Sequence, residues 1–429
     1  MNAPLSTQAT VWPDHFYLID SSRTLEHSLA EDAGRDSMGS KAFNLLRMAQ
    51  AGLPVPAALV VGTYFAHHRK QYQTPLREIG LPALEQATGL KLGDPRKPLI
   101  VSVRSGAPVS MPGMMETLLN IGLCDATVPG LLRQTGNPRL VWDAYRRLVA
   151  SYGEVVEGLP AALFENELQR VTQGRDERQL DFSELRELTQ SFLLLYQQHA
   201  GHAFPQDVHT QLLQAVQAVF ASWEADKARE YRRLNGIDAA MGTAVTIQRM
   251  VFGNAGGRSG AGVGFTRNPS TGEPLLWIDF LANAQGEDVV AGRRNAHGHE
   301  VMADLLPEAW QALEQATDAL EDIFADMQDF EFTVEEGELH LLQARSGKRT
   351  PLATARIALD LHAEGLIDTD TALERTAALQ PEDLATSHLA DDSGTPAQPA
   401  GQAASACSGV CSGEIALDTA RALQRAAEG

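Results

Sequence analysis

The residues best suited to chemistry lie in the segment QDFEFTVEEGELHLLQARSGKRT, at positions 328–350. Asp329 and Glu331 are two positions apart in a predicted strand over 329–334, so both carboxylates project from one face. A second strand is predicted over 338–344. Between the strands, Glu335-Glu336-Gly337 can form a three-residue loop with its glycine in the left-handed conformation.

The length of this loop decides which side chains join the carboxylates. Three residues bring Leu341, Gln343 and Arg345 to the carboxylate face, whereas a two-residue loop puts them on the opposite face. Carboxylates, an amide oxygen and an arginine suit Mg²⁺ bound together with phosphate, because hard oxygens hold the cation and guanidinium pairs with the anion. The alternative is an amphipathic hairpin with a solvated polar face. Asp and Glu are poor strand formers, which favours the functional interpretation.

A second candidate is VSVRSGAPVSMPGMMETLLNIG, at positions 101–122. An apolar strand ends at Arg104, a Ser-Gly-Ala turn follows, and Met-Pro-Gly-Met-Met leads into a predicted helix. A fixed cation beside a mobile flap suits a polyphosphate, which needs a counter-charge and a cover against water. The alternatives are a structural ion pair for Arg104 and core packing for Met111, Met114 and Met115.

Lys41 is a third candidate cation, in the sequence Gly39-Ser40-Lys41-Ala42. It lies in the first turn of a helix predicted over Ser40–Gln50, where N–H groups and the helix dipole favour an anion. At an effective dielectric near 20, one charge pair at ~4 Å is worth roughly 4 kcal/mol before desolvation. The alternative is an ordinary solvated lysine.

A glycine-rich stretch from Gly253 to Gly262 is a fourth candidate. Its glycines are Gly253, Gly256, Gly257, Gly260 and Gly262, and backbone N–H groups in a glycine-rich turn can form an anion-binding concavity. The alternative is a set of simple hairpin turns. Asp279, on a strand predicted over 275–280, is a further carboxylate near this segment.

The remaining pattern places these residues on strands and helices in alternation. Strands are predicted over 58–61, 98–103, 243–252 and 261–266, and the stretch from about 116 to 227 is mostly helical. Helix returns over 303–327, 353–364 and 369–378. Residues 387–406 have the composition of a flexible linker, and 407–429 are too few to bury a core.

Composition limits the partners. The chain has 429 residues, of which 44% are hydrophobic and 21% charged, as in soluble proteins with two or three domains. A formal net charge of -20 disfavours nucleic acid and anionic membranes as partners, so a polyphosphate site must be a local basic pocket. The sparse cysteines Cys124, Cys407 and Cys411, and the lack of a signal-peptide pattern or long apolar run, predict a cytoplasmic protein.

From about Asp14 to Ala378 the chain resembles the N-terminal ATP-binding domain of the pyruvate phosphate dikinase family, in three separated blocks. The resemblance implies an α/β (α+β) fold of the ATP-grasp type, with an inserted helical subdomain and C-terminal linker helices. The expected domains are a nucleotide-binding domain over 1–350 with a helical insert at about 116–227, linker helices over 351–386, a flexible linker over 387–406, and the start of a swivelling domain over 407–429.

Motif by motif, the resemblance also implies roles for the candidate residues, with ATP and Mg²⁺ as cofactors. Lys41, Arg104 and Arg345 would contact phosphates and act in catalysis. Glu331 and Gln343 would hold magnesium, and Asp329 would bind metal or ribose. Gly260 and Gly262 match the family's phosphate-binding loop, and Ser40 and Ala42 replace two glycines of its Gly-Gly-Lys-Gly pattern.

The family's complete enzyme has a swivelling domain with a phosphorylated histidine in a Gly-Gly-Met-Thr-Ser-His context, and a barrel that binds pyruvate and phosphoenolpyruvate. None of the 12 histidines here has that context. The resemblance therefore implies a phosphotransferase module that passes a phosphoryl group from ATP to a separate histidine-bearing chain. The alternatives are a non-catalytic nucleotide-binding or regulatory protein and an inactive truncated fragment.

Overall fold

A computed structural model describes residues 12–21, 32–290 and 298–385, with the isolated positions 390, 395, 414–416, 421, 424 and 425. The predicted flexible linker and the predicted start of a swivelling domain, with Cys407 and Cys411, lie almost wholly outside the described residues. Within Met1–Thr266 and Leu276–Ser346 the described residues form one compact unit, and within Arg267–Leu275 and Gly347–Gly429 they form a second.

Nine strands form two antiparallel sheets in the part of the chain that the structure describes. The first sheet has the order β1-β2-β5-β3-β4 and the second the order β7-β6-β8-β9. The strands are β1 (Phe16–Ile19), β2 (Ala58–Val61), β3 (Val101–Gly106), β4 (Thr117–Ile121), β5 (Ala244–Arg249), β6 (Gly260–Phe265), β7 (Trp277–Ala282), β8 (Gln328–Glu335) and β9 (Glu338–Ser346).

The helices fall into groups along the chain. Those of the first half are α1 (Arg35–Met38), α2 (Ser40–Gln50), α3 (Gln73–Pro75), α4 (Leu81–Thr88), α5 (Val128–Thr135), α6 (Pro138–Val155), α7 (Ala161–Thr172), α8 (Phe182–Ala200), α9 (Val208–Ser222) and α10 (Asp226–Asn235). Those of the second half are α11 (Gly286–Val290), α12 (His299–Leu305), α13 (Pro307–Phe324), α14 (Pro351–Ala363) and α15 (Thr369–Thr376).

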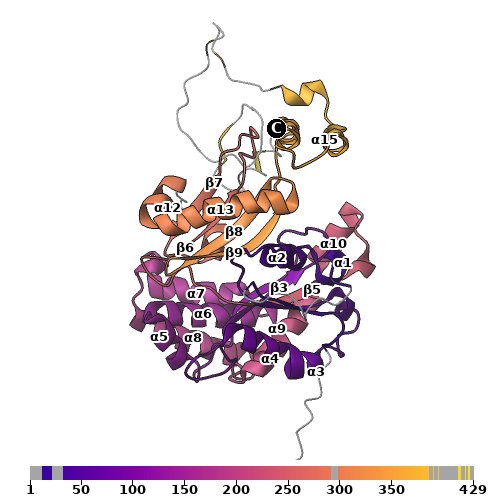
Figure 1. Ribbon diagram of the computed structural model, residues 1–429. Helices are drawn as coiled ribbons and strands as arrows, with labels where there is room; N and C mark the ends of the chain where they lie inside the picture. The colour runs from indigo at the N-terminus through magenta and orange to yellow at the C-terminus, as the bar shows by residue number, and fades with distance from the viewer. Residues whose placement is uncertain are drawn as a thin grey trace, which may run out of the picture. The chain divides into compact units, whose positions relative to one another are not determined.

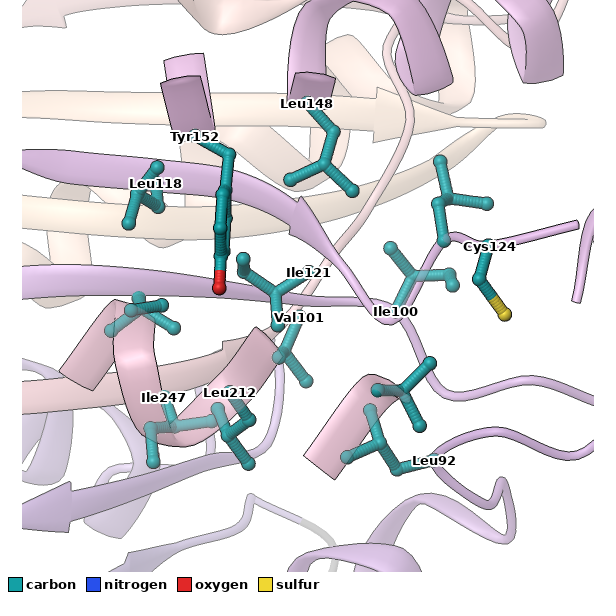
Figure 2. Close-up of a cluster of buried hydrophobic side chains, with 14 of the residues drawn as sticks. Leu92, Ile100, Val101, Leu118, Ile121, Cys124, Leu148, Tyr152, Leu212 and Ile247 are labelled. Atoms are coloured by element: carbon teal, nitrogen blue, oxygen red, sulfur yellow. The ribbon is translucent and has the colours of Figure 1, made fainter. Parts of the chain in front are cut away.

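One face of the first sheet packs against the long helices of the middle of the chain. Figure 2 shows this core, in which side chains of β3, β4 and β5 meet those of α6 and α9. The labelled residues of those elements are Val101, Leu118, Ile121, Leu148, Tyr152, Leu212 and Ile247, each at most 2% exposed. Strand β3 lies between β5 and β4 and contacts α9, so the backbone of Arg104 is held in place.

The opposite face of the first sheet shares a second core with α2 and with one face of the second sheet. Helix α13 lies across that sheet, as Figure 1 shows, and packs on β8 and β9. Phe330, Phe332 and Leu341 point into this core and are nearly inaccessible to solvent. The alternate positions of β8 and β9 therefore form a polar face, which carries the candidate site.

The second unit consists of α14, α15 and the connection between β6 and β7. Arg267 of that connection is almost fully buried and donates to Glu364, at 2.7 Å, while the Thr350 hydroxyl donates to the Ser270 carbonyl. The predicted helices of 351–386 are thus packed against residues 267–275. The domain boundaries expected from the sequence stay a prediction.

The sequence pattern was right for most elements and wrong next to the flap. Helix α2 and strand β2 have the predicted bounds, but the helix predicted after Met115 is wrong, because Thr117–Ile121 is the strand β4 and pairs with β3. Strand β3 continues through Arg104 to Gly106, so the arginine lies within the strand. The single helix predicted over 303–327 is two helices, since Pro307 starts a new first turn.

Two antiparallel sheets with helices packed on them confirm the predicted α+β class, in an arrangement consistent with the ATP-grasp type. A search of the described helices for a length and apolarity sufficient to cross a membrane found no candidate.

Candidate functional site

The hairpin of β8 and β9 places most of the predicted residues on the carboxylate face, but with a loop of a different length from the predicted one. The loop has two residues, Glu336 and Gly337, both with positive φ (50° and 92°), so the predicted three-residue loop is wrong. A two-residue loop alone would turn Gln343 and Arg345 into the core.

A β-bulge corrects the register. Phe332 pairs with Leu341 but Glu331 pairs with Gln343, so Leu342 is an extra residue in β9. Beyond the bulge, Asp329 pairs with Arg345. Gln343 and Arg345 therefore lie on the carboxylate face as predicted, while the same prediction for Leu341 is wrong, because Leu341 is fully buried on the core face.

Arg104 joins the two sheets at this hairpin. Its Nη2 lies 3.2 Å from Oε2 of Glu331, and its Nη1 donates to the Leu342 carbonyl at 3.4 Å and, more weakly, to Oε1 of Gln248 at 3.5 Å. The bulge residue thus supplies the carbonyl that Arg104 uses. The ion pair is only about a quarter exposed on either side, so water screens it less than a surface pair.

Arg345 and Asp329 form the second ion pair of the site. Both Nε and Nη2 of Arg345 approach the same carboxylate oxygen, Oδ2 of Asp329, at 2.8 and 2.7 Å. Arg345 is 44% exposed while Asp329 is 14% exposed. The guanidinium therefore keeps access to solvent on its outer side, where an anion can reach it.

Lys41 is brought to the site by a close backbone contact. A Cβ at Gly39, whose φ is 77°, would lie 1.9 Å from the Gly106 carbonyl oxygen, so only glycine fits there. The N–H and the hydroxyl of Ser40 both donate to the Ala107 carbonyl at 3.0 Å. These contacts fix the first turn of α2, and with it Lys41, against the end of β3.

The charges of the site act on Lys41. Burial, and then repulsion by Arg104, lower the pKa of its ammonium to about 8, while Glu331 acts in the opposite direction. The ammonium has no hydrogen-bond or ion-pair partner among the described residues. Lys41, Arg104 and Arg345 outnumber Asp329 and Glu331, so this is a locally cationic site in an acidic protein.

Gln343, like Lys41, is a polar residue of the site whose side chain has no partner among the described residues. Its side chain is 4% exposed and makes no hydrogen bond to any described residue. Neither amide atom of Gln343 is among the fully buried polar atoms without a partner, so the amide still reaches solvent and its oxygen is available to a ligand. No group of three His, Cys, Asp or Glu side chains gathers as a metal site in the described part of the chain. A cation here would therefore need the amide oxygen, phosphate and water beside the carboxylates.

The glycine-rich stretch has another role than the predicted turn. Gly260 and Gly262 lie within β6, between β7 and β8. The strand predicted over 261–266 already contained Gly262, so only the placement of Gly260 in the preceding turn is wrong. A Cβ at Gly260 would lie 2.3 Å from the ring of Phe280, and one at Gly262 would lie 2.4 Å from the ring of Phe332. The close approach of these aromatic rings to the backbone of β6 therefore explains the glycines. Their role in cofactor binding stays a prediction.

Asp279 lies on the same face as Glu331, but with β6 between them, because Val263 pairs with both. Two strand spacings separate their backbones by roughly 10 Å. Burial raises the pKa of the Asp279 carboxyl. Asp279 therefore borders the site without joining the ion pairs.

Three contributors to the site were not predicted from the sequence. They are the Leu342 carbonyl, the Gln248 amide and the Ala107 carbonyl that caps α2. Of these three, only Gln248 could have been found from the sequence, because it is a polar residue within an apolar strand, where it is buried. A cavity of about 730 Å³ between α6 and α9 is lined by none of the predicted site residues.

The fold and the site define a class: a two-sheet α+β protein with a cationic, carboxylate-bearing site where the sheets meet. A family model, the AMP/ATP-binding domain of pyruvate phosphate dikinase, matches residues 80–306. The chain therefore belongs to the pyruvate phosphate dikinase family through its nucleotide-binding domain.

Individual relatives agree with this assignment. A chloroplastic pyruvate, phosphate dikinase of Mesembryanthemum crystallinum is 46% identical over 347 residues, which are 79% of this chain and 36% of the relative. Pyruvate, phosphate dikinase of Rhizobium meliloti (strain 1021) is 41% identical over 429 residues, which cover 93% of this chain and 46% of the relative. The chain thus spans less than half the length of these relatives.

The titration of Lys41 gives a test of the site. A lysine is charged below its pKa, so we expect ATP affinity to be highest near neutral pH and to fall as the pH rises through about 8. Loss of one charge-assisted contact predicts a fall of roughly tenfold. Lys41→Arg should remove this pH dependence, because guanidinium keeps its charge.

The measurement is calorimetric titration with ATP across this pH range. Lys70→Arg, a change at an exposed lysine of the same chain, is the control and should keep the wild-type profile. An equal fall in wild type and Lys41→Arg would show that another group titrates.

Proposed function

We propose that this protein binds ATP with Mg²⁺ at the site between the two sheets and transfers a phosphoryl group from it to a histidine outside these 429 residues. The observation that supports this most is the Arg104–Glu331 ion pair, with Lys41 near enough to Arg104, Glu331 and Arg345 for their charges to act on it. Membership in a family defined by an AMP/ATP-binding domain supports the nucleotide.

The ligands proposed for Mg²⁺ are Glu331 and Gln343, which pair across β8 and β9. Asp329 is the proposed further ligand, to metal or to ribose. Magnesium prefers oxygen ligands and keeps several waters, so two or three protein oxygens plus phosphate suffice. The amide oxygen of Gln343 makes no hydrogen bond to a described residue, so it is available to such an ion.

The proposed phosphate ligands are Lys41, Arg104 and Arg345. Arg104 and Arg345 are each paired with a carboxylate, of Glu331 and Asp329 respectively. When nucleotide binds, the phosphates would pair with these guanidiniums, and Mg²⁺ would bind the carboxylates in their place. Such a site works by positioning and by neutralising charge in the transition state, rather than by covalent chemistry of its own side chains.

The proposed acceptor of the phosphoryl group is a histidine. The resemblance implies a histidine in a Gly-Gly-Met-Thr-Ser-His context, which these 429 residues lack. A site that only aligns the transferring group can accept that nucleophile from elsewhere. The second candidate function is nucleotide binding without transfer. The intact pairing of both guanidiniums with carboxylates supports it, because these pairs also serve a structural role.

Metal-dependent ATP binding tests the site. Calorimetry should give a micromolar to millimolar dissociation constant for ATP with Mg²⁺ and weaker binding with a chelator. Glu331→Gln keeps the shape of the side chain but removes its charge. In this variant the factor by which Mg²⁺ raises ATP affinity should be smaller by at least about tenfold. Glu338→Gln, an exposed glutamate of the same hairpin, is the matched control.

Two results would contradict the assignment. Folded wild-type protein without detectable binding at millimolar ATP and Mg²⁺ would refute nucleotide binding. Equal Mg²⁺ dependence in wild type and Glu331→Gln would refute the ligand.

Transfer is tested with a carrier. The resemblance implies that histidine takes the β-phosphoryl group of ATP while inorganic phosphate takes the γ-phosphoryl group, so that AMP and pyrophosphate are released. With ATP labelled in the β-phosphoryl group, inorganic phosphate and Mg²⁺, a separate histidine-bearing domain should therefore acquire label, slowly because no tether raises its effective concentration. Arg345→Gln should reduce the labelling. An unlabelled carrier beside intact ATP binding would favour the non-catalytic alternative.

A further inference from the structure

The flap, defined as residues 107–116, is fastened to a small apolar cluster of its own. Ala107 and Met111 are buried against Trp223 and Ala228, and Met114 and Met115 pack on the same cluster. This cluster is separate from the two large cores. The flap therefore rests on α10 and its flanks rather than on either sheet.

Trp223 is the fixed centre of this cluster. Its side chain is 1% exposed, and its Nε1 donates to the Ala239 carbonyl at 3.2 Å. The guanidinium of Arg232 lies 4.1 Å from the ring centroid and also donates to the Trp223 carbonyl. Arg232 itself is 4% exposed. The indole is thus held in one orientation by a hydrogen bond and a desolvated cation–π contact.

Both ends of the flap are tied as well. At its start, the Ala107 carbonyl accepts two hydrogen bonds from Ser40, the neighbour of Lys41. At its end, the Glu116 N–H donates to the Ser222 hydroxyl at 3.2 Å, and Lys227 pairs with the Glu116 carboxylate at 2.6 Å. One end is therefore set by the site and the other by the start of α10.

We propose that Trp223 and Arg232 are positioning residues, which hold the flap in the conformation that covers the phosphates of a bound nucleotide. The proposal rests on the proposed function, in which the site beside Lys41 binds those phosphates. Methionine side chains are flexible, so they define a single flap conformation only when they pack against a rigid surface. The fixed indole of Trp223 provides that surface.

The energetic consequence is a change in population. If loss of the indole leaves the flap competent one-tenth of the time, apparent ATP affinity falls about tenfold, because apparent affinity scales with the competent fraction. AMP lacks the two outer phosphates, so its binding depends less on the flap. The flap conformation then limits the AMP-competent fraction little, and the affinity for AMP should change less than about twofold. A general loss of structure would instead weaken both nucleotides alike.

The experiment combines two readouts on the whole chain. Hydrogen exchange by mass spectrometry follows the flap amides without nucleotide, and calorimetry measures affinity for ATP with Mg²⁺ and for AMP. Trp223→Ala should speed exchange in 107–116 and cost ATP about tenfold in affinity. Trp223→Phe, which keeps an aromatic wall, should restore both. Trp310→Ala on α13 is the control and should change neither.

A second variant covers the case that Trp223→Ala fails to fold. Met111→Ala removes the contact from the flap side and should give the same selective loss of ATP affinity. Unchanged flap exchange in both variants, or equal losses for ATP and AMP, would overturn the proposal. Failure of wild type to bind ATP would instead refute the proposed function, while the exchange data would still report on the anchoring.

Discussion

Arg104 is the contact on which the candidate site depends, because one side chain bonds to both sheets at once. It leaves β3 of the first sheet and reaches Glu331 and the Leu342 carbonyl of the second. That carbonyl belongs to the residue that β9 inserts as a bulge. The same bulge sets Gln343 and Arg345 on the carboxylate face, so a single extra residue both aims the ligands and supplies an acceptor to the arginine.

The flap and the lysine depend on this frame in turn. Gly39 allows the first turn of α2 to touch Gly106, and Ser40 closes that contact on Ala107. Lys41 is thereby placed where burial and the charge of Arg104 lower the pKa of its ammonium. A local excess of cations is what an anionic ligand requires from a chain whose formal net charge is -20. The fold concentrates a few cations instead of making the whole surface basic.

Prediction from the sequence succeeded where a residue's role follows from local spacing. Asp329 and Glu331 share a face because side chains alternate along a strand, and Ser40–Gln50 has clear start and stop signals. It failed where the reason lies across the fold. The glycines of β6 resembled a phosphate-binding turn, whereas their lack of a Cβ makes room for the rings of Phe280 and Phe332. The loop length was also wrong, and the correct face of Gln343 followed only because an unpredicted bulge compensated. The sequence of β4 has a helix-like pattern and no local signal that favours a strand. The segment is a strand because it pairs with β3.

The central claim is that the bulged hairpin and Arg104 form one site for nucleotide and metal. A crystal structure with a non-hydrolysable ATP analogue and Mn²⁺ in place of Mg²⁺ tests it most directly, because anomalous scattering locates the metal. The account predicts Mn²⁺ bound by Glu331 and the amide oxygen of Gln343, at close to the roughly 2.0–2.1 Å that Mg²⁺ adopts with oxygen ligands. It also predicts Arg104 in contact with phosphate. Nucleotide bound elsewhere, with the Arg104–Glu331 pair unchanged and no metal beside Gln343, would contradict the account.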